Sequence, residues 1–524
     1  MSIKASKILL ITGTLAEDAV RRYSKESKLK TEVVVFKIAV AALLTPEIIV
    51  KGLENMNLTS FDKILVPGLV RGDTALITKA VGVETFKGPR YAADLPTVLE
   101  SLDDVLLSTV VPACDLLREK IQKKALQEIE KTEQNREELL KKPGNMLIGS
   151  LAIGKDFPMR VLAEIVDAPL LDNKTIKHLA KAFAQAGASI IDVGMVAGES
   201  KPSDAKRIVR IVKQVVNVPV SIDSLDPAEI RAAVDAGAEF VLSADGGNLE
   251  AIAHFVSNVA VVIIPTNQSQ GYFPKKAEER VKLVEQIIGK AKKLGISKCL
   301  ADLILEPSDI LESFIAFRQF SQRNPDVPIF VGVSNVTELM DADSVGINAL
   351  LARLSAEVDA SILLATEKSN KAKGTVAEEV AASKMMFLAK KRDSVPKDLG
   401  IDLLVLKDKQ NREQQFDKRV EKIARITFAE KPDLAQLDPK GSFTIMLDRD
   451  CKEIVALYYP SAKTETPERI IKGKTADAIY LEIAKLGLVS RMDHMAYLGV
   501  ELEKAEIALK IGKEYIQDSA LFKK

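Results

Sequence analysis

The sequence is poor in the residues that most often build metal centres and disulfide frameworks. Its 524 residues include three histidines, three cysteines and no tryptophan. The cysteines, Cys114, Cys299 and Cys451, lie far apart without C-x-x-C spacing, which argues against a disulfide scaffold and a cysteine zinc site. No two histidines stand at ligand spacing, which argues against a histidine-rich metal centre. This cysteine usage fits a reducing cytoplasm.

The chain also lacks an excess of charge and a long apolar run. Lys and Arg number 74 and Asp and Glu 73, for a net charge of +1. A chain this balanced has no overall field that would attract DNA or RNA, so we expect no nucleic-acid partner. No run approaches the roughly 20 apolar residues of a membrane helix. The first apolar run ends at Gly13 without a cleavage pattern. We therefore expect a cytoplasmic protein without a membrane segment.

Two common catalytic signatures are missing as well. No Gly-x-Ser-x-Gly segment occurs, and three histidines offer no credible Ser-His-Asp set. The Gly-x-Gly-x-x-Gly fingerprint of dinucleotide binding is also absent. These absences argue against hydrolase-type nucleophiles and against a classical dinucleotide site.

What is present is an alternation of strand-like and helical segments, which predicts an α/β protein. Residues 1–116 predict a small Rossmann-like domain with strands at 7–12, 32–38 and 63–68. Residues 117–145 predict a connecting helix with interspersed charges, and residues 393–524 a small C-terminal α/β domain. That last domain is expected to contain strands at 442–448 and 454–459, followed by two helices.

The alternation is most regular between residues 146 and 392. After a short β segment, eight strand-like runs are separated by amphipathic helical stretches. The runs lie at 160–167, 189–194, 219–223, 240–244, 260–265, 299–305, 328–334 and 360–366. This pattern predicts a central (β/α)₈ (TIM) barrel.

Polar residues gather where these strands end, which in such a barrel is the location of the active site. They are Asp167, Asp192, Asp223, Ser243, Asp245, Asp302, Ser334, Asn335, Thr366 and Glu367. A ring of acids is compatible with a divalent metal, a cationic substrate or a heterocycle with several N–H donors, such as a pterin. Chemistry alone favours the pterin only slightly over the metal.

Two segments resemble a known family. GASIIDVGMVAGESKPSDA (187–205) is similar to the second-strand motif of dihydropteroate synthases, and VPVSIDSLDPAEIRAAVDAGAEFV (218–241) to their third strand and the entry to the fourth. With extra domains at both ends, the chain resembles the archaeal dihydropteroate synthase-related proteins. The resemblance covers the central half of the chain and implies a pterin-binding barrel with a reduced pterin as substrate.

The resemblance also implies roles for individual residues. Asp223 and Asp302 fall on the third- and sixth-strand acids that bind the pterin, and Asp192 on the second-strand acid beside them. Lys201 stands where the synthases have an arginine that helps to bind the anionic arylamine. Asp167 lies near the first-strand residue associated with Mg²⁺ and diphosphate. Asp167, Asp192 and Lys201 are therefore the candidate catalytic residues.

The chain departs from the synthase pattern in three places. Ser243 replaces the fourth-strand Asn and is retained as a candidate pterin contact. Asn335, another candidate pterin contact, stands near the usual seventh-strand Lys. The Arg-x-His end of strand eight is missing, and the nearby lysines are candidate anion ligands: Lys368, Lys371 and Lys373. The segments GVSN, GINALL and DLILEP are more similar to the corresponding segments of pterin-dependent methyltransferases than to those of the synthases.

Three functions follow, in order of preference. The first is a Mg²⁺-assisted synthase that joins a dihydropterin-6-ylmethyl diphosphate to an arylamine with release of diphosphate. The amine expected from the resemblance is ribofuranosylaminobenzene 5'-phosphate of tetrahydromethanopterin biosynthesis. The second is transfer of a methyl group from a methyl-tetrahydropterin to a corrinoid or thiol, and the third is pterin binding without catalysis. The resemblance also implies a homodimer.

Overall fold

The computed structural model describes residues 7–102, 105–406, 419, 422–429, 437–460 and 465–522. They form two compact units. The first unit consists of the chain up to Thr366 together with Thr375–Leu403, and the second of Glu367–Gly374 together with the chain from Leu404 onward. A four-stranded sheet and a closed barrel lie in the first unit, and a three-stranded sheet in the second.

The four-stranded sheet of the first unit is parallel, with the order β2-β1-β3-β4. Its strands are β1 (Lys7–Gly13), β2 (Lys30–Phe36), β3 (Lys63–Val66) and β4 (Glu84–Lys87). Its helices are α1 (Glu17–Ser24), α2 (Pro46–Leu53), α3 (Ala75–Val81) and α4 (Leu95–Leu99). Alternate residues of β1 enter different apolar clusters: Ile8 and Leu10 pack with Leu95, whereas Leu9 and Ile11 pack with Ile49. Both faces are therefore covered, as predicted for a Rossmann-like sheet.

A charged helical segment leads from this sheet to the barrel. It contains α5 (Ala113–Leu116), α6 (Arg118–Gln134) and α7 (Arg136–Leu139). Glu133 of α6 accepts two hydrogen bonds, of 2.7 and 3.0 Å, from the guanidinium of Arg160, the first residue of the barrel. The long helix is thereby fixed to the first barrel strand.

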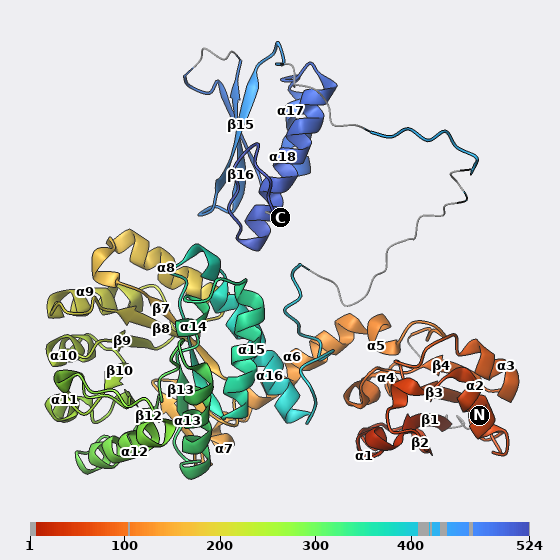
Figure 1. The fold of residues 1–524 in the computed structure, drawn as a ribbon, viewed down its shortest axis with the longest axis horizontal. Helices are drawn as coiled ribbons and strands as arrows, with labels where there is room; N and C mark the ends of the chain where they lie inside the picture. Colours follow the sequence, from red (N-terminus) through yellow and green to blue (C-terminus); the bar gives the residue numbers. More distant parts are fainter. Residues whose placement is uncertain are drawn as a thin grey trace. The chain divides into compact units, whose positions relative to one another are not determined.

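The barrel closes with eight parallel strands in sequence order. They are β7 (Arg160–Ile165), β8 (Ile190–Gly194), β9 (Val220–Asp223), β10 (Phe240–Ala244), β11 (Ala260–Ile263), β12 (Cys299–Ala301), β13 (Ile329–Val331) and β14 (Ala360–Ala365). Helices surround them (Figure 1). They are α8 (Asn173–Ala186), α9 (Pro202–Lys213), α10 (Pro227–Asp235), α11 (Leu249–Val256), α12 (Ala277–Lys293), α13 (Ile310–Arg323), α14 (Ser334–Thr337), α15 (Ser344–Glu357) and α16 (Thr375–Lys391). The predicted (β/α)₈ barrel is confirmed.

The interior of the barrel is a packed apolar core. Its members include Leu162, Phe240, Leu300 and Phe330. A hairpin of β5 (Asn145–Ile148) and β6 (Leu151–Gly154) precedes the first barrel strand. The fully buried side chains of Ile148 and Ile153, from this hairpin, belong to the same core, so the hairpin closes the end of the barrel opposite the mouth.

The second unit contains an antiparallel sheet in the order β15-β16-β17. Its elements are β15 (Ser442–Asp448), β16 (Glu453–Tyr459), β17 (Arg469–Gly473), α17 (Ala476–Lys485) and α18 (Met492–Ile511). Phe443, Ile454 and Ile471 pack against Ile479 and Leu502 of the two helices. The unit is thus a small α/β domain with its own core, as predicted.

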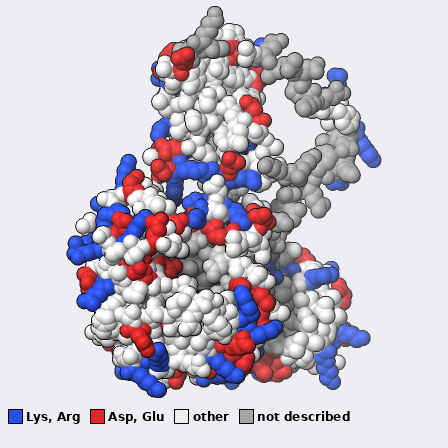
Figure 2. All heavy atoms as spheres, turned by 60° about the vertical axis from the view of Figure 1, so that its left-hand side comes forward, with Lys and Arg blue, Asp and Glu red and all other residues white. Residues whose placement is uncertain are grey.

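The surface carries charges of both signs. On the face drawn in Figure 2, Lys and Arg side chains lie interspersed with Asp and Glu side chains. This mixture agrees with the balanced composition of the chain. Among the described helices, none has both the length and the apolar character that crossing a lipid bilayer requires.

Candidate functional site

An acidic layer lies on top of the apolar core, at the carboxyl ends of the barrel strands. Alternate residues along a barrel strand face the interior. Three strands supply interior residues to the apolar core, namely Leu162, Ile190 and Leu300. The residues two positions further on are acids: Glu164, Asp192 and Asp302. On these strands, the inward-facing residues therefore change from apolar in the core to acidic at the mouth.

Three of the carboxyl groups form a tight cluster. One carboxylate oxygen each of Glu164, Asp192 and Asp223 lies within 4.8 Å of the others. Strand register explains this closeness, because Glu164 pairs with Asp192 and Asp192 with Ser221 across neighbouring parallel strands. Asp192 is fully buried, and its Oδ1 accepts a hydrogen bond of 2.5 Å from the Ser221 hydroxyl. Its Oδ2 has no hydrogen-bond partner among the described residues.

Three aspartates of the mouth hold protons more tightly than ordinary carboxyl groups do. Burial, reinforced by the charges of Asp223 and Glu164, raises the pKa of Asp192 well above its usual value. Burial also raises the pKa of Asp223, to about 6, and that of Asp302, to about 7. For Asp302, a hydrogen bond from the Ile304 N–H and the charge of Arg280 oppose the rise. Near neutral pH the mouth therefore offers both proton donors and proton acceptors.

The loops after β10 and β11 are joined by a fully satisfied acid. Asp245 is buried and accepts hydrogen bonds from the backbone N–H groups of Gly247 (2.7 Å), Asn248 (3.1 Å) and Gln268 (2.7 Å) and from the hydroxyl of Thr266 (2.9 Å). This acid shapes the mouth without being available to a ligand. Ser243, the candidate pterin contact two residues earlier, is half-buried, and its carbonyl accepts a hydrogen bond of 3.1 Å from the Asn248 side chain.

A second buried acid joins the loops after β8 and β9. Glu229 accepts hydrogen bonds from the Lys201 backbone N–H (2.7 Å) and the Ser224 hydroxyl (2.5 Å). Lys201 is thereby fixed at the start of α9. Its ammonium group forms an ion pair with Glu199. The candidate anion ligand therefore lies beside the mouth, with a carboxylate already bound to it.

Two further candidates lie on the loops themselves. Asn335, exposed on α14, donates a hydrogen bond of 3.3 Å to the carbonyl of Leu305, which links the loops after β13 and β12. Asp167 follows β7 in a left-handed turn, with φ of 50°. The first-strand acid that completes the carboxyl cluster is Glu164, three residues before it. Sequence reasoning missed Glu164 because it took acids from strand ends and did not follow the inward alternation.

The lysines after the eighth strand belong to the second compact unit. Lys368, Lys371 and Lys373 lie within its segment Glu367–Gly374. The ammonium group of Lys373 donates a hydrogen bond of 2.7 Å to the carbonyl of Glu367. These three candidate anion ligands therefore belong to the second unit.

The oxygen donors of the cluster suit a hard divalent cation. Glu164, Asp192 and Asp223 offer carboxylate oxygens at mutually close positions, and Mg²⁺ prefers such ligands. The unpartnered Oδ2 of Asp192 is a further available donor. If a Mg²⁺ ion binds here, these three residues would hold it, and Asp167, predicted from sequence, would not be among the cluster's ligands.

Comparisons with known proteins identify the family of the barrel. Residues 167–367 match the pterin binding enzyme family, residues 6–90 match a family of unknown function (DUF6513), and residues 437–518 match a family described as PterinBD-DUF4346. An uncharacterized protein of Methanocaldococcus jannaschii is 42% identical over 534 residues, which cover 98% of this chain and 99% of that protein. A methylcorrinoid:tetrahydrofolate methyltransferase of Eubacterium limosum is 25% identical over 180 residues, which cover 32% of this chain and 66% of that enzyme.

Solved structures similar to the chain include dihydropteroate synthases. That of Xanthomonas albilineans with 7,8-dihydropteroate is 20% identical and covers 46% of this chain and 96% of its own, with a TM-score of 0.37. That of Yersinia pestis with a pterin–sulfa conjugate is 18% identical and covers 47% and 99%, with a TM-score of 0.38. The chain belongs to the pterin-binding enzyme family, together with the Methanocaldococcus jannaschii protein that it matches along nearly its whole length.

Proposed function

We propose that the protein is a transferase that binds a reduced pterin in the mouth of its barrel. The observation that carries this proposal is the layer of four acids formed by Glu164, Asp192, Asp223 and Asp302, of which the three aspartates have raised pKa values. A pterin ring presents an amino group and ring N–H donors together with nitrogen and oxygen acceptors, so a mixture of ionised and protonated carboxyl groups complements it. Membership of the pterin-binding family supports the same substrate class.

The reaction that fits this site best is transfer of a methyl group from N5 of a methyl-tetrahydropterin to a nucleophile, such as a corrinoid or a thiol. The N5–CH₃ bond breaks as the nucleophile bonds to carbon, and N5 leaves with the electron pair of that bond. A proton supplied to N5 makes it a better leaving group. Asp192 is the candidate donor, because burial and its acidic neighbours raise its pKa and so favour its protonated form. The match to the Eubacterium limosum methyltransferase supports this chemistry.

Synthase chemistry is the second candidate, and Lys201 at the start of α9 is the observation that favours it. In this reaction diphosphate leaves a dihydropterin-6-ylmethyl diphosphate, and the nitrogen of an arylamine bonds to the exocyclic carbon. Ribofuranosylaminobenzene 5'-phosphate is the expected amine, with Lys201 as the anion ligand at the mouth. Mg²⁺ would supply charge neutralisation for the diphosphate. We rank this reaction second because the ammonium group of Lys201 is already paired with Glu199.

Binding is the first test of the pterin proposal. Isothermal titration calorimetry with 5-methyl-tetrahydrofolate and 5-methyl-tetrahydromethanopterin should detect a complex that Asp192→Asn and Asp302→Asn weaken by at least about tenfold. Asp326→Asn is the matched control, because this exposed acid precedes β13 at the opposite end of the barrel. Equal affinities for all four proteins, or no binding by the wild type, would refute the pterin site.

Turnover then separates the two reactions. In the methyl-transfer assay, the protein receives a methyl-tetrahydropterin with cob(I)alamin or a thiol as the acceptor. In the synthase assay, it receives dihydropterin-6-ylmethyl diphosphate, Mg²⁺ and a panel of arylamines. Methylated acceptor that accumulates with wild type and not with Asp192→Asn supports methyl transfer. Diphosphate release that depends on an amine would reverse the ranking.

A further inference from the structure

A fully buried arginine lies behind the mouth, between the loops that follow β11 and β12. Arg280 of α12 has no exposed side-chain surface, and all three of its guanidinium nitrogens donate hydrogen bonds. From the loop after β11, the carbonyl oxygens of Pro274 and Lys275 accept bonds of 3.1 and 3.4 Å. The guanidinium therefore fixes the path of this loop.

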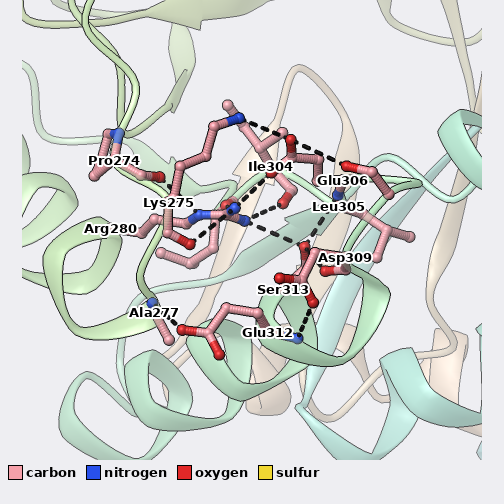
Figure 3. Close-up of polar contacts among 12 residues, drawn as sticks. Pro274, Lys275, Ala277, Arg280, Ile304, Leu305, Glu306, Asp309, Glu312 and Ser313 are labelled. Atoms are coloured by element: carbon pink, nitrogen blue, oxygen red, sulfur yellow. Dashed lines mark hydrogen bonds and ion pairs between the residues drawn. The ribbon is translucent and has the colours of Figure 1, made fainter.

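The same guanidinium binds the loop after β12 (Figure 3). The carbonyl oxygens of Ile304 and Leu303 accept hydrogen bonds of 3.0 and 3.4 Å, and the carboxylate of Glu306 accepts one of 2.8 Å. The hydroxyl of Ser313, on α13, accepts another of 3.2 Å and also a bond of 3.0 Å from the Glu306 backbone N–H. One cation thus joins two loops and a helix.

This loop begins at Asp302. The Ile304 N–H donates a hydrogen bond of 2.8 Å to Oδ1 of Asp302, while the Ile304 carbonyl binds Arg280. Ile304 has a φ of 63°, in the left-handed region that a β-branched residue rarely adopts. Such a conformation costs of order 1–3 kcal/mol and persists only where neighbouring contacts impose it. The bonds on either side of Ile304 are contacts of this kind.

We infer that Arg280 is a positioning residue of the pterin site: by fixing residues 302–306, its guanidinium fixes the orientation of the Asp302 carboxyl group toward the ligand. The inference rests on the proposed pterin site, since Asp302 acts there. The charge of Arg280 adds a second effect, because it favours the ionised form of Asp302 and opposes the rise in pKa that burial causes. A buried arginine that only filled space would not need six acceptors.

Lys275 provides a matched control on the same acid. Its ammonium group pairs with Glu306 at 2.8 Å, as Arg280 does, but its side chain is 67% exposed, compared with none for Arg280. Removing Lys275 therefore takes one cation from Glu306 without opening the buried network. A difference between the two variants reports on the network, not on Glu306 alone.

The test measures Asp302 directly and then its ligand. The pKa of Asp302 is followed by ¹³C NMR of the carboxyl carbon in the free protein, with assignment from Asp302→Asn. Arg280→Met should raise this pKa, because a cation that favours the ionised carboxylate is lost. Affinity for 5-methyl-tetrahydrofolate at pH 7 should fall by about tenfold, and the loss should shrink as the pH rises. Arg280→Lys should recover part of both effects, and Lys275→Met should match the wild type.

Each other outcome has a defined meaning. A folded Arg280→Met with the wild-type pKa of Asp302 and wild-type affinity would overturn the inference. If Arg280→Met does not fold, Ser313→Ala, which removes a neutral partner of the guanidinium, must lower the affinity for the pterin by a smaller amount, and an unchanged affinity would overturn the inference. If the wild type binds no pterin, the proposed function fails, whereas the NMR measurement still decides whether Arg280 controls Asp302.

Discussion

A buried acid on α16 should make the barrel less stable than it could be. Glu379 is fully buried, and neither of its carboxyl oxygens has a hydrogen-bond partner among the described residues. Burial, and secondly the charge of Glu378, raises its pKa well above the ordinary 4.5. Glu378 itself is well bound, because it accepts hydrogen bonds from Asn348 (2.7 Å) and Ser344 (3.0 Å). The two adjacent acids should therefore respond oppositely to substitution.

We predict that Glu379→Met stabilises the protein. An unsatisfied buried polar group costs about 1–3 kcal/mol, and methionine is an unbranched side chain of similar length. For a domain the size of the barrel, each kcal/mol shifts the melting temperature by about 2–4 °C, so an increase of roughly 2–12 °C is expected. Glu378→Gln should lower the melting temperature, because it removes a bound carboxylate.

The raised pKa of Glu379 predicts how the stability of the wild type changes with pH. Below pH 4.5 Glu379 is protonated in both the folded and the unfolded chain. As the pH rises above this value, the unfolded chain releases the proton and the folded chain keeps it, so the wild type loses stability until the pH passes the raised pKa. The advantage of Glu379→Met should therefore be smallest in acid and grow toward neutral pH.

Differential scanning calorimetry is the suitable assay, since the chain has no tryptophan for fluorescence. Melting of the first compact unit is compared between pH 4 and pH 8 for the wild type, Glu379→Met and Glu378→Gln. A difference between the wild type and Glu379→Met that does not change with pH would refute the reasoning. So would a Glu379→Met protein that melts lower at pH 8.

Three further predictions test other parts of the chain. In Gly194→Ala, the new Cβ would lie 2.1 Å from a carboxylate oxygen of Glu164, so the Glu164 carboxylate must leave the acid cluster. Titration calorimetry should show about a tenfold loss of affinity for 5-methyl-tetrahydrofolate. Gly346→Ala, which meets nothing within 4 Å, should match the wild type. Asp245→Ala leaves four donors without their acceptor, two of them buried, and should lower the stability of the barrel by about 2–4 kcal/mol, seen as a lower calorimetric transition. Hydrogen bonds lower the pKa of Asp438 far below its ordinary value. The contribution of Asp438 to stability is therefore present at neutral pH and is lost only in strong acid. Asp438→Asn should lower the melting temperature of the second unit at pH 7 and leave that of the barrel unchanged.

The barrel could be predicted from the sequence because its strands are apolar on both faces. β11 (AVVI) and β14 (ASILLA) are buried at every position, and such runs are the usual mark of parallel strands between a core and covering helices. Two strands were not predicted, β4 and β17. Both are at an edge of their sheet and carry charged residues, so their apolar signal is weak.

The acids of the mouth were only partly predictable. Asp192, Asp223 and Asp302 were chosen because strand position and family resemblance pointed to the same residues. Glu164 was overlooked in favour of Asp167, although counting inward positions from Leu162 leads to it. For these acids, the direction in which a residue faces was more informative than its distance from the strand end.

The contacts that position the mouth could not have been predicted. Four of the acceptors around Arg280 are backbone carbonyl oxygens, and any residue type supplies a carbonyl. An arginine on an amphipathic helix is typical of a solvated face. Only the folded loops show that this one is enclosed and that it binds the loop that begins at Asp302.

The β5–β6 hairpin has a consequence for kinetics. Because Ile148 and Ile153 fill the far end of the barrel and the core above them is packed, a pterin and a second substrate bound as proposed would have to enter through the same opening. Two substrates that share one entrance either occupy it together or use it in turn. A large acceptor such as a corrinoid would cover the bound pterin, so the order of addition becomes a measurable property: direct transfer of the methyl group requires both substrates bound together and predicts intersecting double-reciprocal plots.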